Sequence, residues 1–119
     1  MTQPKPVYKR GDVALVLFPH SNLKTAKVRP VLVVQADDIQ TGLSQLIVAM
    51  ITSRMFRANH SCRVTIRLSS PEGQQSGLLT DSVVMTDNLA TIAESEIDRI
   101  IGSLSMDKVD IALRYTLGL

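Results

Sequence analysis

Two short polar stretches at the ends of apolar segments contain the residues best suited to chemistry. Val28-Arg29-Pro30 leads into one apolar run, and Ile51-Thr52-Ser53 closes another. A guanidinium presents planar donors that match two phosphate oxygens, and a threonine hydroxyl can add a donor toward charge that grows on phosphorus. Together these residue types suit phosphodiester chemistry. An arginine before a proline is also common on protein surfaces, and Thr-Ser is common in turns, so the spacing alone leaves both interpretations open.

The other candidate side chains favour structural roles. An unperturbed imidazole titrates near neutrality, so His20 could serve as a general acid or base, but a histidine in a loop is usually just exposed to solvent. The same applies to His60, with less support. Asp37 and Asp38 are adjacent, so a turn explains them better than an acid–base pair. Cys62 is the single cysteine, so we expect an inert buried thiol. With no metal-binding motif and no glycine-rich phosphate loop, we expect neither a metal nor a cofactor.

The charge is distributed unevenly along the chain. Residues 1–67 contain ten Lys and Arg against three Asp, whereas residues 68–119 contain three against eight acidic residues, for a net charge of +2. The first half could therefore form a basic surface that attracts phosphates, although solvated loops explain the same pattern equally well. Because only 3% of residues are aromatic and none is Trp, we expect nucleic acid to be held mainly by polar contacts.

Length and composition predict one domain. The chain has 119 residues, of which 45% are apolar, enough for one core. Its apolar runs are far shorter than the roughly 20 residues of a membrane helix. No apolar stretch follows the first basic residues, as a secretory signal would require, so we expect a cytoplasmic protein. Residues 1–9 predict a frayed tail, and residues 10–119 a single domain.

Apolar and β-branched runs predict short strands joined by polar loops. The expected strands are 13–18, 30–35, 46–51, 62–68, 82–85 and 89–92. Residues 20–28 predict a long exposed loop, and residues 36–44 and 69–77 predict turns. Such strands indicate a small β-barrel.

The end of the chain predicts one amphipathic helix. Ser105 could cap it, and Gly118 could stop it. Its apolar positions follow a spacing of three or four residues: Met106, Val109, Leu113 and Leu117.

Five motifs together resemble the MazF/PemK family of toxins, over about residues 9–119. They are Arg10-Gly-Asp-Val13, Lys27-Val-Arg-Pro-Val-Leu-Val-Val34, Leu46-Ile-Val-Ala-Met-Ile-Thr-Ser53, Asp81-Ser-Val-Val84 and Asp107-Lys-Val-Asp-Ile-Ala-Leu113. Each motif is common alone, but their order and spacing make the combination specific.

The resemblance implies a fold and an activity. It implies an SH3-like β-barrel with a C-terminal helix, a homodimer, and a ribosome-independent endoribonuclease acting on single-stranded RNA without a metal. The ribose 2′-hydroxyl would attack the neighbouring phosphate and leave a 2′,3′-cyclic phosphate and a 5′-hydroxyl. Arg29 and Thr52 fall on the family's catalytic positions, where they would stabilise transition-state charge, with Arg29 also a candidate proton donor. A labile antitoxin would cover the RNA groove.

The RNA groove implied by the resemblance takes further residues from the basic half. We expect it to include His20, Lys24, Lys27, Ser53, Arg54 and Arg57. The chain departs from many relatives in two places, since residues 20–28 lack glycines and Ala90 stands where many members have arginine. An RNA contact could therefore be missing, and the substrate sequence cannot be carried over.

Two other functions fit the sequence. A non-catalytic barrel of the same type could act on a protein such as a topoisomerase, with the terminal helix carrying the function. An inert small-barrel adaptor is the third interpretation. In the non-catalytic alternative, Arg29→Ala and Thr52→Ala would remain toxic, whereas an inert adaptor would cause no growth arrest on expression.

Overall fold

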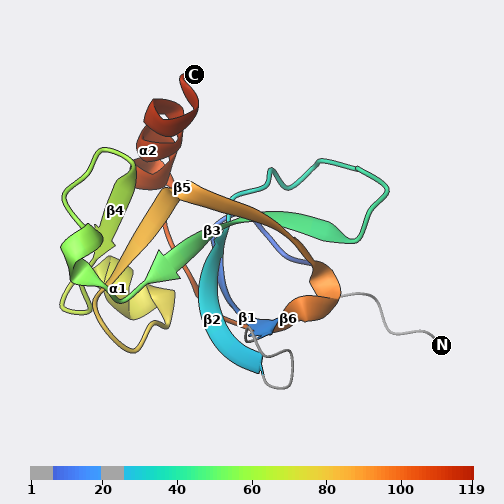
Figure 1. Ribbon diagram of the computed structural model, residues 1–119, viewed down its shortest axis with the longest axis horizontal. Helices are drawn as coiled ribbons and strands as arrows, with labels where there is room; N and C mark the ends of the chain where they lie inside the picture. The colour runs from blue at the N-terminus through green and yellow to red at the C-terminus, as the bar shows by residue number, and fades with distance from the viewer. Residues whose placement is uncertain (1–6, 20–25) are drawn as a thin grey trace.

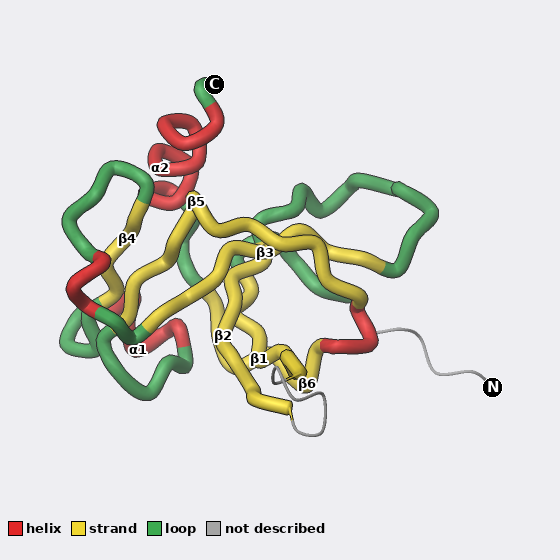
Figure 2. Tube along the Cα trace, in the orientation of Figure 1, coloured by secondary structure: helices red, strands yellow, loops and turns green. Residues whose placement is uncertain are grey.

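Six antiparallel strands form one curved sheet in the computed structural model, which describes residues 7–19 and 26–119 (Figure 1). The strands are β1 (Asp12–Pro19), β2 (Ala26–Val33), β3 (Gln45–Thr52), β4 (Arg63–Ile66), β5 (Ser82–Ala93) and β6 (Ile97–Ser103). Their order across the sheet is β4-β5-β3-β2-β1-β6. The helices are α1 (Pro71–Ser76) and α2 (Asp107–Leu117), and the 3-10 turns are η1 (Met55–Arg57) and η2 (Glu94–Glu96). Figure 2 shows η1 in the connection that follows β3.

The predicted mainly β fold with a C-terminal helix is confirmed, but the sheet does not close into a barrel. Strands β4 and β6 are its two edges, with no pairing between them among the described residues. Helix α1 packs against β6 instead. This approach requires glycine, because a Cβ at Gly102 would clash with the backbone of Gln75 and Ser76. A Cβ at Gly77 would likewise clash with Ile101.

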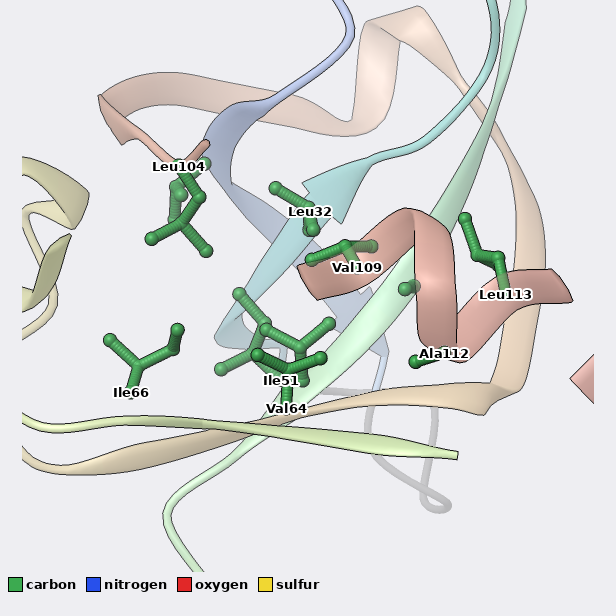
Figure 3. Close-up of a cluster of buried hydrophobic side chains, with 11 residues drawn as sticks. Leu32, Ile51, Val64, Ile66, Leu104, Val109, Ala112 and Leu113 are labelled. Atoms are coloured by element: carbon green, nitrogen blue, oxygen red, sulfur yellow. The ribbon is translucent and has the colours of Figure 1, made fainter. Parts of the chain in front are cut away.

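The end of strand β2, Val31–Val33, lies at the centre of the fold and is buried on both faces. Leu32 belongs to a cluster that includes Ile51 and, from α2, Val109 (Figure 3). Val31 and Val33 point to the opposite face and join a second cluster. Each fully buried Val or Leu contributes roughly 1.5–3 kcal/mol, so this strand is held firmly. The buried part of the strand expected at residues 30–35 is Val31–Val33.

Several element boundaries differ from the sequence prediction. Residues 26–28 belong to β2 and not to a loop, whereas residues 20–25 and 1–6 lie outside the described residues. The predicted turn at 69–77 contains α1, where Ser70 Oγ accepts from Gly73 N–H at 3.0 Å. Strand β6 was not predicted, because its side chains are only partly buried.

Helix α2 confirms the predicted C-terminal helix with changes at its ends. Gly118 ends it in the left-handed conformation, as predicted. Met106, and not Ser105, is the residue before its first turn. Val109 and Leu113 are buried, but Leu117 is exposed because α2 runs past the edge of the core.

Candidate functional site

A cleft of about 680 Å³ opens where β2 and β3 separate. The last pair of the β2–β3 ladder is Val31 with Met50. Pro30 comes next and has no N–H to donate, which favours the end of the ladder there. Continued pairing would set Arg29 opposite Thr52. Both residues line the cleft at the diverging strand ends.

The structure brings together most of the residues that the sequence singled out for chemistry. Strand β2 contributes two of them, and β3 with the segment after it contributes four: Lys27, Arg29, Thr52, Ser53, Arg54 and Arg57. The other two, His20 and Lys24, lie outside the described residues and remain predictions. The β2 and β3 segments meet through strand pairing although they are far apart in the sequence.

Thr52 is half-buried and oriented by a local hydrogen bond. Its Oγ1 accepts from the backbone N–H of Arg54 at 3.1 Å. Because the oxygen is an acceptor there, the hydroxyl proton is directed elsewhere and can be donated to a ligand. Arg29 is exposed on the facing strand. Arg29 and Thr52 therefore place a guanidinium and a hydroxyl donor in the lining of the same cleft.

The cleft is strongly basic. Its described lining includes no Asp or Glu and five basic residues, namely Lys27, Arg29, Arg54, Arg57 and Arg99. Like charges on the walls of a concave surface concentrate a positive potential there, which attracts polyanions. Arg99 comes from β6, in the acidic half of the chain, and the sequence analysis missed it. Arg99 is far from the other four basic residues in the sequence, so no local motif connects it with them.

One wall of the cleft is made by a large bulge in β5. In the β3–β5 pairing, Ala49 lies opposite Leu89 and the next residue, Met50, lies opposite Met85. Residues 86–88 of β5 therefore have no partner in β3. Thr86 is buried there, and its Oγ1 lies 2.6 Å from the Cys62 carbonyl oxygen and 2.7 Å from Thr116 Oγ1. These bonds tie the bulge to the residue before β4 and to α2.

The rest of the bulge places Asn88 in the cleft lining. Asp87 forms an ion pair with Arg63, with Oδ2 2.8 Å from Nη2 and Oδ1 3.4 Å from Nε. The Arg63 guanidinium holds the pKa of Asp87 below its ordinary value, and this interaction raises the pKa of Arg63. Arg63 Nη1 also donates to the Arg57 carbonyl at 3.2 Å. Arg63 thus links Asp87 in the bulge to the backbone of Arg57, and both segments contribute residues to the cleft lining. The sequence predicted two separate strands here and missed Asn88.

A second carboxylate fixes the loop before β5. Asp81 Oδ1 accepts from Leu68 N–H at 2.8 Å, and Oδ2 accepts from Arg67 Nη1 at 3.2 Å. The Leu68 N–H, followed by Arg67, lowers the pKa of Asp81. This anchor holds the end of residues 77–80, which line the cleft.

The weaker sequence candidates lie away from the cleft lining. Asp37 Oδ1 accepts from Arg10 N–H at 2.6 Å, in keeping with a structural role. His60 Nδ1 accepts from Cys62 N–H at 3.1 Å, and Cys62 is buried with a free thiol, as expected. Within residues 7–19 and 26–119, no three His, Cys, Asp or Glu side chains are grouped to hold a metal ion. No described helix is long and apolar enough to cross a membrane.

The sequence matches a known family over nearly its whole length. A family model described as PemK-like, MazF-like toxin of type II toxin-antitoxin system matches residues 9–117. The chain belongs to this toxin family. Endoribonuclease EndoA of Bacillus subtilis (strain 168) is 34% identical over 117 residues, which span 95% of this chain and 97% of that protein.

Solved structures share the PemK/MazF fold of this chain. An endoribonuclease in complex with its cognate antitoxin from Mycobacterial species is 23% identical, with a TM-score of 0.71, 94% of this chain covered and 96% of that chain. The MazE–MazF crystal structure (Form-II) from Deinococcus radiodurans matches at 18% identity and a TM-score of 0.72, covering 97% of this chain and 99% of that one. At these identities the structures establish the fold alone.

Proposed function

We propose that this PemK/MazF-family toxin is a metal-independent endoribonuclease that cleaves single-stranded RNA. The observation that carries the proposal is that Arg29 and Thr52 line one basic cleft, at the separated ends of β2 and β3. Residues with these two donor types fit a phosphate whose negative charge grows during reaction. The name of the Bacillus subtilis relative, an endoribonuclease, supports the same activity.

The proposed reaction is an internal transesterification. The 2′-oxygen of one ribose forms a bond to the adjacent phosphorus and gives up its proton to a solvent water, and the bond from phosphorus to the 5′-oxygen of the next nucleotide breaks. Arg29 binds the non-bridging oxygens and can donate the proton that the 5′-oxygen takes up, and Thr52 donates to the phosphate through its hydroxyl. The products are a 2′,3′-cyclic phosphate and a 5′-hydroxyl.

The remaining cleft residues would position the strand. Lys27, Ser53, Arg54 and Arg57 line the cleft and can contact phosphates on either side of the scissile one. His20 and Lys24 are proposed as further RNA contacts on the sequence alone. Asn88 and Arg99 join this group because of their place in the lining. Ala90 stands where many relatives have arginine, and Arg99 could supply the positive charge that this position lacks.

The proposed partners follow from the family and its solved members. We expect a homodimer and a cognate antitoxin that competes with RNA for the cleft, because one structural relative is in complex with its antitoxin. An acidic antitoxin segment would complement the basic lining. We expect both proteins to act in the cytoplasm, where mRNA is found.

Cleavage of a long transcript in EDTA, with mapping of the fragment ends, tests the proposal. The wild-type protein should produce fragments that polynucleotide kinase labels directly, because their 5′ ends are hydroxyls. Arg29→Ala should lose cleavage by roughly 100-fold or more and remain folded. Arg114→Ala is the matched control, because this exposed arginine lies on α2 and not in the cleft lining.

Two results would contradict the proposal. One is cleavage by Arg29→Ala at the wild-type rate, and the other is fragments with 5′-phosphates. Growth arrest without RNA cleavage, lost on substitution of α2, would favour the non-catalytic alternative.

A further inference from the structure

Phe56 presents an exposed aromatic ring beside the basic cleft. Its side chain is 80% exposed, on η1 between the cleft-lining residues Arg54 and Arg57. Single exposed apolar residues are ordinary on protein surfaces. Phe56 differs because the cleft-lining residue Arg57 lies over its ring. The Arg57 Cζ lies 5.7 Å from the ring centroid, within the range of a cation–π interaction.

The Arg57 guanidinium connects the ring to the cleft wall. Its Nη1 lies 3.6 Å from Sδ of Met85, a buried residue of β5 that lines the cleft. Phe56 therefore lies at the rim of the cleft, with the Arg57 guanidinium between its ring and the cleft wall. The high exposure of the ring leaves room for a planar ligand.

The turn that carries the ring is held by four hydrogen bonds. Arg57 N–H donates to the Arg54 carbonyl, and Ala58 N–H to the Met55 carbonyl, both at 3.0 Å. Arg63 Nη1 donates to the Arg57 carbonyl at 3.2 Å. The fourth bond runs from Arg54 N–H to Thr52 Oγ1 at 3.1 Å, and so links the turn to the proposed catalytic hydroxyl. Because the backbone that carries the ring is already fixed, the turn would lose little freedom on binding a ligand.

We propose that Phe56 is a stacking platform for one nucleobase of the bound RNA, next to a phosphate held by Arg57. This inference rests on the proposed function. Every base has a flat π-face, so stacking adds affinity without selecting a sequence, and it favours single strands, whose bases can be splayed out. The prediction that polar contacts dominate RNA binding is thereby modified at one position. Loss of such a stack lowers RNA affinity by roughly 5- to 150-fold.

A unique fluorophore can report the stack directly. The chain has no Trp, so Phe56→Trp creates a single indole at the rim of the cleft. The probe is a 12-nucleotide RNA that spans the mapped major cut site, with a 2′-deoxyribose at the cut nucleotide so that it binds but is not cleaved. We expect this RNA to quench the indole emission. Phe56→Trp should also cleave the corresponding all-ribose RNA at about the wild-type rate, because indole stacks as well as phenyl.

Phe56→Leu keeps an apolar side chain but removes the π-face. We expect its Kd for the same probe and its KM to rise by about 10-fold, with kcat at saturating RNA nearly unchanged. Tyr115→Leu is the matched control, because Tyr115 is 63% exposed on α2 and does not line the cleft. It should bind and cleave RNA as the wild type does. Both rings are exposed, so neither substitution removes a core side chain, and circular dichroism checks that each variant is folded.

The outcomes separate this inference from the proposed function. If the wild type cleaves RNA while Phe56→Leu keeps its Kd and Phe56→Trp is not quenched, stacking is refuted and the nuclease stands. If the wild type cleaves no RNA, both are refuted. If Phe56→Leu instead weakens the dimer or the antitoxin complex and leaves RNA affinity intact, Phe56 belongs to a protein interface and the inference is overturned.

Discussion

Thr52 combines two hydrogen-bonding roles in one side chain. Its oxygen accepts from Arg54 N–H at 3.1 Å, which leaves the hydroxyl proton for the substrate. Thr52→Val keeps the shape but removes both roles, so we expect kcat to fall by roughly 100-fold. Thr52→Ser keeps the hydroxyl and should retain most of the activity. Single-turnover cleavage of a short RNA measures both rates. Equal rates for the Val variant and the wild type would remove the hydroxyl from the mechanism.

At the residue scale, local motifs predicted part of the site. Arg29 and Thr52 could be singled out because each borders an apolar run, and the structure places both in one cleft. Asn88 and Arg99 could not be found in this way. Asn88 reaches the cleft through a bulge, and Arg99 through the pairing of β6 with β1. Such placements depend on contacts between distant segments, which spacing along the chain does not reveal.

At the scale of elements, the Arg63–Asp87 pair holds the β5 bulge and η1 together. Asp87→Asn should lower Tm by a few degrees at pH 7 and raise KM for RNA several-fold, because Asn88 and Arg57 lose their support. The charge swap Arg63→Asp with Asp87→Arg should recover part of both losses. Thermal unfolding and cleavage kinetics measure the effects. A swap that behaves no better than the single variants would show that charge pairing does not matter there.

The pH dependence of this pair has a definite sign. The pKa of Asp87 is lowered in the folded protein, chiefly by hydrogen bonds from Arg63. Its stabilising contribution is therefore complete above the unfolded pKa of about 3.9 and is lost as the pH falls through the folded value. We expect the Tm difference between wild type and Asp87→Asn to be constant from pH 7 to about 5 and to shrink below about 4. A difference that grows on acidification would contradict this assignment.

The elements that the sequence predicted best are the ones whose own apolar residues mark them. The apolar runs of β2 and β3 and the spaced apolar residues of α2 indicated the right structures. Helix α1 was missed although Ser70, Pro71 and Gly77 are typical end signals, because the segment is short and polar. Strand β6 was missed because packing by α1 and pairing with β1, and not its own pattern, define it.

At the scale of the whole molecule, the cleft gathers charge that the small net charge conceals. Five basic residues line a cleft in a protein of net charge +2. If most of them contact phosphates, log Kd for single-stranded RNA should rise with log salt with a slope of roughly 3. Arg99→Gln should lower that slope by about 0.7. Fluorescence anisotropy between 50 and about 300 mM salt measures the slope. A slope near zero would contradict a phosphate-lined cleft.

The overall architecture was predicted in its class but not in its closure. Short strands indicated a barrel, whereas the sheet remains open between β4 and β6. Closure depends on how edge strands meet, and here the glycines at 77 and 102 admit α1 beside β6. The uneven charge along the chain did become a basic cleft, and one cationic residue from the acidic half, Arg99, joined it.

The central claim is that Arg29 and Thr52 act on the same phosphate. A double-mutant cycle on the single-turnover cleavage rate in EDTA, with Arg29→Ala, Thr52→Val and the double variant, tests it most directly. Groups that stabilise one transition state together should be strongly non-additive, so the double variant should be little slower than Arg29→Ala alone. Rate losses that multiply, or a Thr52→Val rate equal to that of the wild type, would contradict the account.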